Sequence, residues 1–153
     1  MGITVRLVGL QPYLLDDIYR DPSLLDRTGD DRVTAGKVDL EKAWAGIEFL
    51  LGGEPDALGT SCWQLAGTTD EVPPRVIGEE AVAAVAHALV RISPDELRRR
   101  FDPDALVQAD VYPPALWHQE DALEYLLERF ADLVWFYKRA AALGWAVLVY
   151  TTL

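Results

Sequence analysis

Few side chains in this sequence have the chemistry of a catalytic nucleophile. Cys62 is the only cysteine, and Ser61 precedes it. Gly59 and Ser61 resemble the start of a nucleophile elbow, but the closing glycine is missing. A nucleophile also needs a base, and His118 is the base that Cys62 would use. Two alternatives follow: a small hydrolase or transferase using Cys62 with His118, or a buried structural thiol at Cys62.

Metal binding requires several His, Cys or carboxylate ligands that converge. The chain has two histidines, His87 and His118, which are far apart in the sequence. His118 lies near Glu120 and Asp121, but acids at the start of a helix are favoured by the helix dipole alone. We predict no metal site, no cofactor and no recognisable catalytic set.

Five tryptophans are many for a chain of 153 residues. Tryptophan is usually buried for packing, and the alternative is an aromatic ligand pocket. Such a pocket would take a small molecule whose identity the sequence does not indicate. The candidate ligand-binding residues are Trp44, Glu48, Trp63, Tyr112, Trp117 and His118.

Trp135 falls opposite the apolar face of a long predicted helix, among charged residues. Tryptophan is favoured at interface hot spots, so a protein partner or a second copy of the chain could dock there. The alternative is that the protein's own loops cover this side chain. The candidate interface residues are Glu128, Asp132, Trp135 and Arg139.

The composition limits the classes of partner. The 25 acids outnumber the 14 bases, giving a net charge of -11, which repels phosphate backbones and anionic lipid. We therefore expect no nucleic acid partner. Charges interrupt the apolar stretches well before the length of a membrane span, so we expect no membrane association. The lone Cys62 favours a reducing compartment, and we predict a cytoplasmic protein.

The chain has the length of one domain, and we predict a single domain over residues 1–153. Residues 3–8 alternate as a strand that Gly9 closes, and residues 146–150 form an apolar run typical of a strand covered on both faces. These terminal strands are expected to pair, with residues 75–77 as a possible third strand. The predicted fold is α+β, with a small mixed sheet packed against several helices.

Two helices dominate the prediction. Asp39 is a favourable N-cap, and Gly52 with Gly53 provides a left-handed stop, which predicts a central helix over 39–52. That helix is apolar on nearly all sides, so other parts of the chain should cover both of its faces. The second is the long periodic segment 120–143, which Gly144 ends.

The remaining segments are shorter. Residues 12–19 and the starts at Gly78, Ser93-Pro94 and Asp102-Pro103 predict further helices. Residues 27–37 are rich in charge and glycine and are expected to form an exposed loop. Residues 54–74 are expected to form a loop, with a possible strand at 62–65.

Several spaced motifs resemble the YfbM-like family of uncharacterised bacterial proteins. The resemblance spans nearly the whole chain and is carried by residues 1–3, 38–53, 76–78, 101–103, 111–113, Trp117, 136–137 and Gly144. It implies a small α+β fold without an established reaction. Family members often carry histidine where this chain has Ala45 and Glu48. If those histidines bind a metal or react, this chain has lost that chemistry.

Three functions are compatible with these features. The first is a non-catalytic binding or protein-interaction module, which the acidic composition and Trp135 favour. The second is the hydrolase or transferase built on Cys62 and His118. The third is a toxin-neutralising (immunity-type) protein, because an acidic domain could cover a basic enzyme surface.

Overall fold

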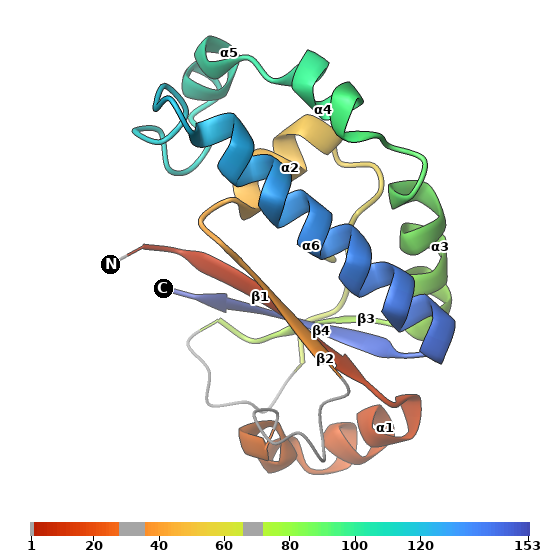
Figure 1. Cartoon of the computed structure of the whole chain (residues 1–153). Helices are drawn as coiled ribbons and strands as arrows, with labels where there is room; N and C mark the ends of the chain where they lie inside the picture. Colours follow the sequence, from red (N-terminus) through yellow and green to blue (C-terminus); the bar gives the residue numbers. More distant parts are fainter. Residues whose placement is uncertain (1, 28–35, 66–71) are drawn as a thin grey trace.

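The computed structural model describes residues 2–27, 36–65 and 72–153, and only the backbone of residues 25–27. Helices and strands follow in a mixed order (Figure 1). The elements are β1 (Thr4–Leu10), α1 (Pro12–Arg20), the 3₁₀ helix η1 (Pro22–Arg27), β2 (Gly36–Glu41), α2 (Trp44–Leu51), β3 (Arg75–Ile77), α3 (Glu79–Leu89), α4 (Pro94–Arg100), α5 (Pro103–Gln108), α6 (Ala122–Leu143) and β4 (Ala146–Thr152).

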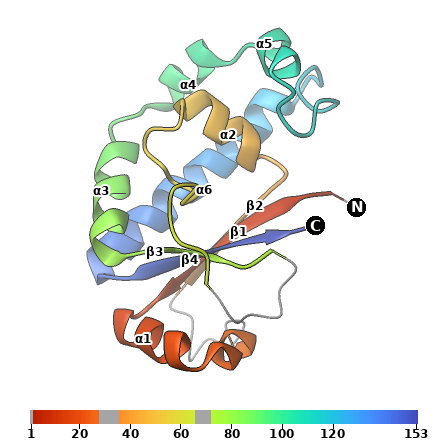
Figure 2. The same cartoon turned by 180° about the vertical axis from the view of Figure 1, so that it is seen from behind.

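The four strands form one sheet in the order β2-β1-β4-β3, and the α+β class is confirmed. The terminal strands pair as expected, with Thr4 opposite Thr152. Both chain ends therefore lie side by side (Figure 2). The expected mixed sheet is wrong, because every pair among the described strands is antiparallel. Residue patterns indicate which segments are strands, but the connections between the strands decide whether neighbours run parallel or antiparallel.

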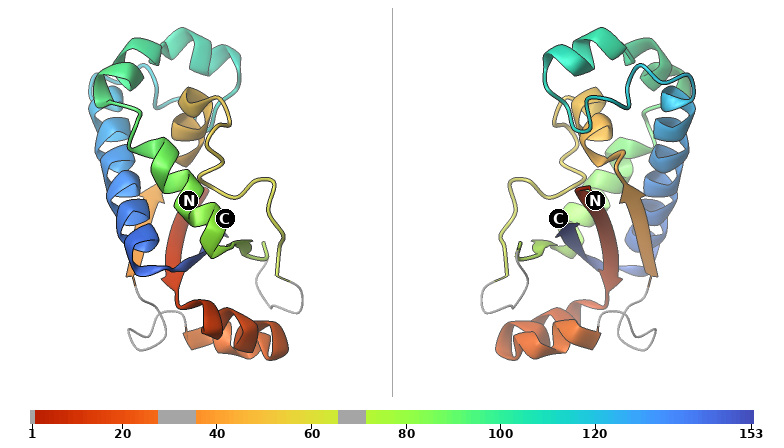
Figure 3. Two further views of the ribbon diagram at one scale, coloured as in Figure 1. Left: turned by 90° about the vertical axis from the view of Figure 1, so that its right-hand side faces the viewer. Right: turned by 90° about the vertical axis from the view of Figure 1, so that its left-hand side faces the viewer.

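Both faces of the sheet are covered. Along β1, Val5 and Leu7 point into the larger core, whereas Val8 and Leu10 point into a smaller one on the opposite face. Helices α2, α3 and α6 cover the first face, and α1 covers the second (Figure 3). The prediction that the last strand is covered on both faces is confirmed, since Val147 and Leu148 belong to different cores.

The first strand continues past the glycine that was expected to close it. Gly9 lies within β1, opposite Val147 of β4. The ring of Trp145 lies against Gly9, and a Cβ atom built there would be 2.4 Å from Cε3 of that ring. Glycine is therefore required here by close packing of an aromatic ring, and not as a strand terminator.

The expected start of the central helix is wrong. Asp39 lies in β2, and α2 begins only at Trp44. Val38 and Leu40 are buried while Asp39 is exposed, which is the alternation of a strand. The Asp39 side chain does accept a backbone N–H, but the donor is Glu41 at 2.8 Å, the last residue of β2, and not a residue of the helix.

The later helix signals are confirmed. Ser93 Oγ accepts the N–H of Glu96, and Asp102 accepts two N–H groups at the start of α5. Gly78 precedes α3, and Gly144 ends α6 in a left-handed conformation with φ +71°. Helix α6 begins two residues later than predicted. Within the described residues, no helix is both long and apolar enough to cross a lipid bilayer.

The two predicted loops have different outcomes. Of the loop expected at 27–37, residues 28–35 lie outside the described part of the chain, and Gly36 with Lys37 belongs to β2. Of the segment 54–74, residues 66–71 are likewise not described. Gln64 forms an isolated antiparallel bridge with Arg75, so the possible strand there is reduced to one residue pair.

Candidate functional site

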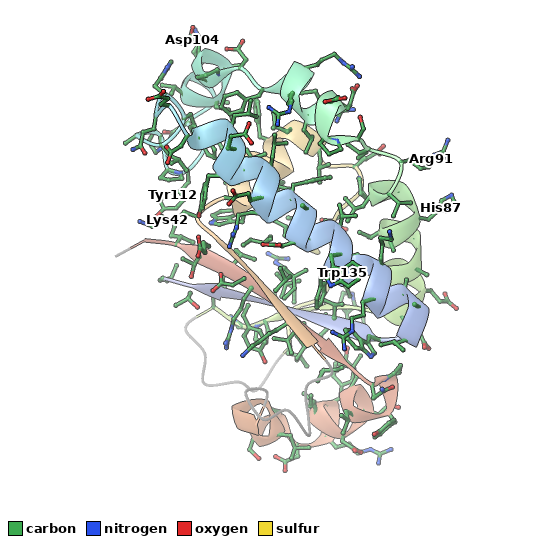
Figure 4. The ribbon with its side chains drawn as sticks, in the orientation of Figure 1. Lys42, His87, Arg91, Asp104, Tyr112 and Trp135 are labelled. Atoms are coloured by element: carbon green, nitrogen blue, oxygen red, sulfur yellow. The ribbon has the colours of Figure 1, made fainter. Side chains whose placement is uncertain are left out.

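Trp135 lies on the outer face of α6, and 68% of its surface is exposed (Figure 4). At about 100° per residue, Glu128, Ala131, Trp135 and Lys138 share one stripe of the helix. All four are exposed, whereas Leu126, Phe130, Leu133 and Tyr137 face the core. None of the described segments covers the Trp135 ring. A single exposed aromatic residue is normal on a protein surface, and it marks a contact surface when further apolar surface lies beside it.

An apolar hollow of about 470 Å³ lies on one side of Trp135. Its floor comes from α6, where Phe130 is 4% exposed, and its opposite wall comes from the turn between α3 and α4. In that turn Val90 is exposed and Ile92 is half-buried. The polar side chains of the lining are those of Ser93 and Lys138. The hollow therefore offers apolar surface directly beside the indole ring.

A second hollow, of about 340 Å³, lies on the other side of Trp135, between α6 and β2. Three basic side chains and two acidic ones line it, together with the rings of Trp135, Phe136 and Trp145. The charged residues are Lys37, Asp39, Arg129, Asp132 and Arg139. Trp135 thus forms a ridge between an apolar hollow and a charged one.

Arg129 connects the charged hollow to the end of β2. Its guanidinium lies 3.6 Å from Asp132 and 3.8 Å from Glu41, and its Cζ is 6.0 Å from the ring centre of Tyr125. Tyr125 in turn donates its hydroxyl to Glu41 at 2.9 Å. The Nε atom of Arg129 is buried and has no hydrogen-bond partner among the described residues. These contacts fix α6 against the end of β2.

The charges of α6 balance, unlike those of the chain as a whole. The helix contains three acids and three bases: Glu124, Glu128, Arg129, Asp132, Lys138 and Arg139. The whole chain has 25 acids and 14 bases. The net charge of -11 therefore comes from outside this helix, and its outer face is a locally neutral part of an acidic protein.

The predicted interface residues come together as one surface. Asp132 and Arg139 line the charged hollow with Trp135, and Glu128 lies within 4.0 Å of Arg129. The guanidinium of Arg139 lies over the ring of Trp145 at 5.5 Å. Sequence reasoning missed Ala131 and Lys138, although helical spacing from Trp135 would have found both. It could not find the wall formed by the turn between α3 and α4.

Two of the aromatic ligand candidates hold the N-terminal segment in place. Trp44 and Tyr112 stack with ring centres 6.1 Å apart. Trp44 Nε1 donates to the carbonyl of Ile3 at 3.0 Å, and the N–H of Ile3 donates to the Tyr112 hydroxyl at 2.8 Å. Tyr112 also lies near Lys42 (Figure 4). This pair therefore binds the chain's own backbone before β1.

The other tryptophan candidates lie in opposite environments. Trp117 is 1% exposed, and its Nε1 donates to the carbonyl of Val111 at 2.9 Å. Trp63 is 81% exposed in the segment before the bridge to β3. Neither hollow beside α6 includes either ring. The structure thus distributes the candidate aromatics over the core, the N-terminal clamp and a separate surface.

Asp56 organises the loop that contains Cys62. Its carboxylate accepts four hydrogen bonds, from the backbone N–H and hydroxyl groups of Thr60 and Ser61, at 2.6–3.0 Å. Burial alone would raise the pKa of Asp56, but these hydrogen bonds outweigh burial and hold the pKa below its ordinary value. Arg75 completes the loop by donating to the carbonyls of Thr60 and Cys62.

The pKa values of two neighbours of Asp56 are raised above their ordinary values. Burial raises the pKa of the Glu48 carboxyl, and the charge of Asp56 raises it further, while Arg75 lowers it. Burial also raises the pKa of the Cys62 thiol, again with a contribution from Asp56. The thiolate is the reactive form of cysteine, so this environment disfavours a nucleophile.

The two histidines do not join this cluster. His118 is exposed and lies 3.2 Å from Asp104 of α5. No hydrogen bond of the described residues links it to Cys62, whose electrostatic neighbours are Asp56 and Arg75. His87 is on the outer side of α3 beside Arg91 (Figure 4). Within the described part of the chain, no three His, Cys, Asp or Glu side chains form a group that could hold a metal ion.

Comparisons with known proteins agree with the resemblance to YfbM-like proteins. The fold is similar to the crystal structure of YfbM from Escherichia coli, a protein of unknown function, with a TM-score of 0.71 and 17% identity over 97% of this chain and 99% of that one. At this identity the likeness shows the fold alone. No curated protein matches the sequence. The model of the family described as "Domain of unknown function (DUF1877)" matches residues 1–150, and the chain therefore belongs to that family.

Proposed function

We propose that this protein is a non-catalytic protein-interaction module that binds its partner through the outer face of α6. The observation that carries the proposal is the position of Trp135, 68% exposed on a ridge between an apolar and a charged hollow. An aromatic anchor beside apolar surface, with charges at the margin, is the composition of an interface hot spot.

The other candidate functions have less support. An enzyme built on Cys62 and His118 would need the two side chains joined, and each has different neighbours in the described structure. A toxin-neutralising protein would present its acidic surface to a basic enzyme, whereas α6 is neutral in charge. We also propose that this module works in the cytoplasm, which the lone Cys62 supports.

Site-specific photo-crosslinking tests the proposed surface. A photoreactive amino acid replaces Trp135 in one variant and Trp63 in a matched control, since both are highly exposed tryptophans. Each variant is expressed in the cells that produce the protein naturally and is then irradiated. We expect a discrete crosslinked protein from position 135 and not from position 63. Equal crosslinking from both positions, or none from position 135, contradicts the proposal.

A further inference from the structure

We infer that the partner of the α6 face is a second copy of this chain, bound with the two α6 helices antiparallel. This inference rests on the proposed function, because it assigns an occupant to the same surface. Its basis is the order of exposed residues along the stripe: an acid at Glu128, a small residue at Ala131, the aromatic ring of Trp135 and a base at Lys138.

The order of the stripe is self-complementary when the direction of the helix is reversed. Glu128 and Lys138 lie five residues on either side of position 133, and Ala131 and Trp135 lie two residues on either side of it. A twofold axis at that position places Glu128 of each copy opposite Lys138 of the other. It also places each Trp135 ring opposite Ala131, where a short side chain leaves room for it.

The apolar hollow supports this arrangement. Ala131 lines the hollow together with Trp135, Leu127 and Val134, so a ring that reaches Ala131 of the partner also meets this apolar surface. The Trp135 ring, exposed in one copy, would become covered in the pair. Burial of such a ring is the largest favourable contribution that this face can make.

The charges of α6 are compatible with contact between two copies. Two copies with a net charge of -11 each repel one another over most of their surfaces. Helix α6 carries no net charge, because its three acids and three bases cancel, and Arg129 and Asp132 already pair with each other at 3.6 Å. Glu124 and Glu128 precede the centre of the stripe, while Lys138 and Arg139 follow it. Lys138 has no ion pair or hydrogen bond among the described residues, so it is available for Glu128 of a second copy.

Sedimentation equilibrium of the purified full chain over a concentration series tests this inference. We expect twice the 17.0 kDa mass of one chain for the wild type and for Trp63→Glu. Trp135→Glu should weaken dimerisation by at least about 30-fold, as loss of a hot-spot residue does. Circular dichroism of each variant verifies folding, since all the substituted side chains are exposed.

Charge reversal tests the antiparallel register. Glu128→Lys and Lys138→Glu each place like charges opposite one another twice per dimer, and each should weaken dimerisation by about tenfold. An equimolar mixture of the two single variants should form a heterodimer, because both contacts then join opposite charges. The double variant should dimerise like the wild type for the same reason.

The outcomes separate this inference from the proposed function. A wild-type chain that stays monomeric, or a dimer that neither charge reversal weakens, overturns the inference. If a monomeric chain still crosslinks from position 135 to another protein, the proposed function stands and the inference that the partner is a second copy is wrong. If position 135 crosslinks to nothing and the chain is monomeric, both are wrong.

Discussion

Trp117 lies directly against Gly46: a Cβ atom built on Gly46 would be 2.3 Å from Cη2 of the Trp117 ring. Gly46 is in the first turn of α2, and Trp117 is 1% exposed in the segment that leads to α6. The ring is also held by its hydrogen bond to Val111. This contact joins the short central helix to the chain before α6, and it makes Trp117 part of the core and not of a ligand pocket.

Gly46→Ala should destabilise the protein. In an exposed helix, alanine is the better helix former by about 1 kcal/mol, but here its methyl group meets a buried ring that cannot move freely. We expect a loss of about 1–3 kcal/mol in the free energy of unfolding, measured by urea denaturation. Gly78→Ala is the control, because nothing lies within 4 Å of its Cβ position. An increase in stability for Gly46→Ala would contradict this packing.

Asp56→Asn should destabilise the protein at neutral pH. The carboxylate accepts four hydrogen bonds through its two oxygen atoms. In asparagine an NH₂ group replaces one of these oxygens, and that group cannot accept a hydrogen bond from an N–H or hydroxyl donor. We expect a loss of about 1–3 kcal/mol in the free energy of unfolding at pH 7. Because the folded pKa of Asp56 lies below 3.8, the ionised group stabilises the fold above that value. The difference between wild type and variant should therefore shrink as the pH falls below about 4. A difference that is independent of pH would show that the charge is not responsible.

Glu48→Gln should stabilise the protein at neutral pH, whereas Asp56→Asn should destabilise it. Burial raises the folded pKa of Glu48 above 4.5, so ionisation is less favourable in the folded state than in the unfolded chain. This cost is absent below the unfolded pKa and is complete above the folded one. We expect the variant to unfold at a higher temperature than the wild type at pH 7 and at the same temperature at about pH 3. Reduced stability at pH 7 would show that the Glu48 charge is instead favourable, through Arg75.

Tyr137→Phe tests the connection between α6 and the Asp56 loop. The Tyr137 hydroxyl donates to the carbonyl of Ala57 at 2.5 Å, and both residues are buried. Removing the donor leaves that carbonyl without a partner, which costs about 1–3 kcal/mol. Tyr13→Phe is the matched control, because Tyr13 is 66% exposed. Equal midpoints of denaturation for the two variants would contradict a structural role for the Tyr137 hydrogen bond.

Local signals predicted much of the fold. The caps at Ser93 and Asp102 and the glycine stop at Gly144 depend on a few adjacent residues, and the structure confirms them. The expected start of the central helix failed for a physical reason, because Asp39 lies between two buried residues that alternate as a strand. The segment forms a strand by pairing with β1, which is distant in the sequence.

The candidate surface was partly predictable for similar reasons. The outward position of Trp135 follows from helical spacing within α6, and 68% exposure confirms that spacing. Its neighbours Val90 and Ile92 come from another segment, so no local pattern could place them beside the ring. Gly9 shows the same limit, since its role depends on the ring of Trp145 across the sheet.

The most direct test of the α6 surface is hydroxyl-radical labelling of the protein inside the cells that produce it, compared with the dilute purified chain. The quantity measured by mass spectrometry is the ratio of labelling at Trp135 to labelling at Trp63, both of which are exposed in a single chain. We predict that this ratio falls several-fold in cells, because a bound partner covers Trp135 and leaves Trp63 accessible. An unchanged ratio would contradict the claim that the outer face of α6 is a binding surface.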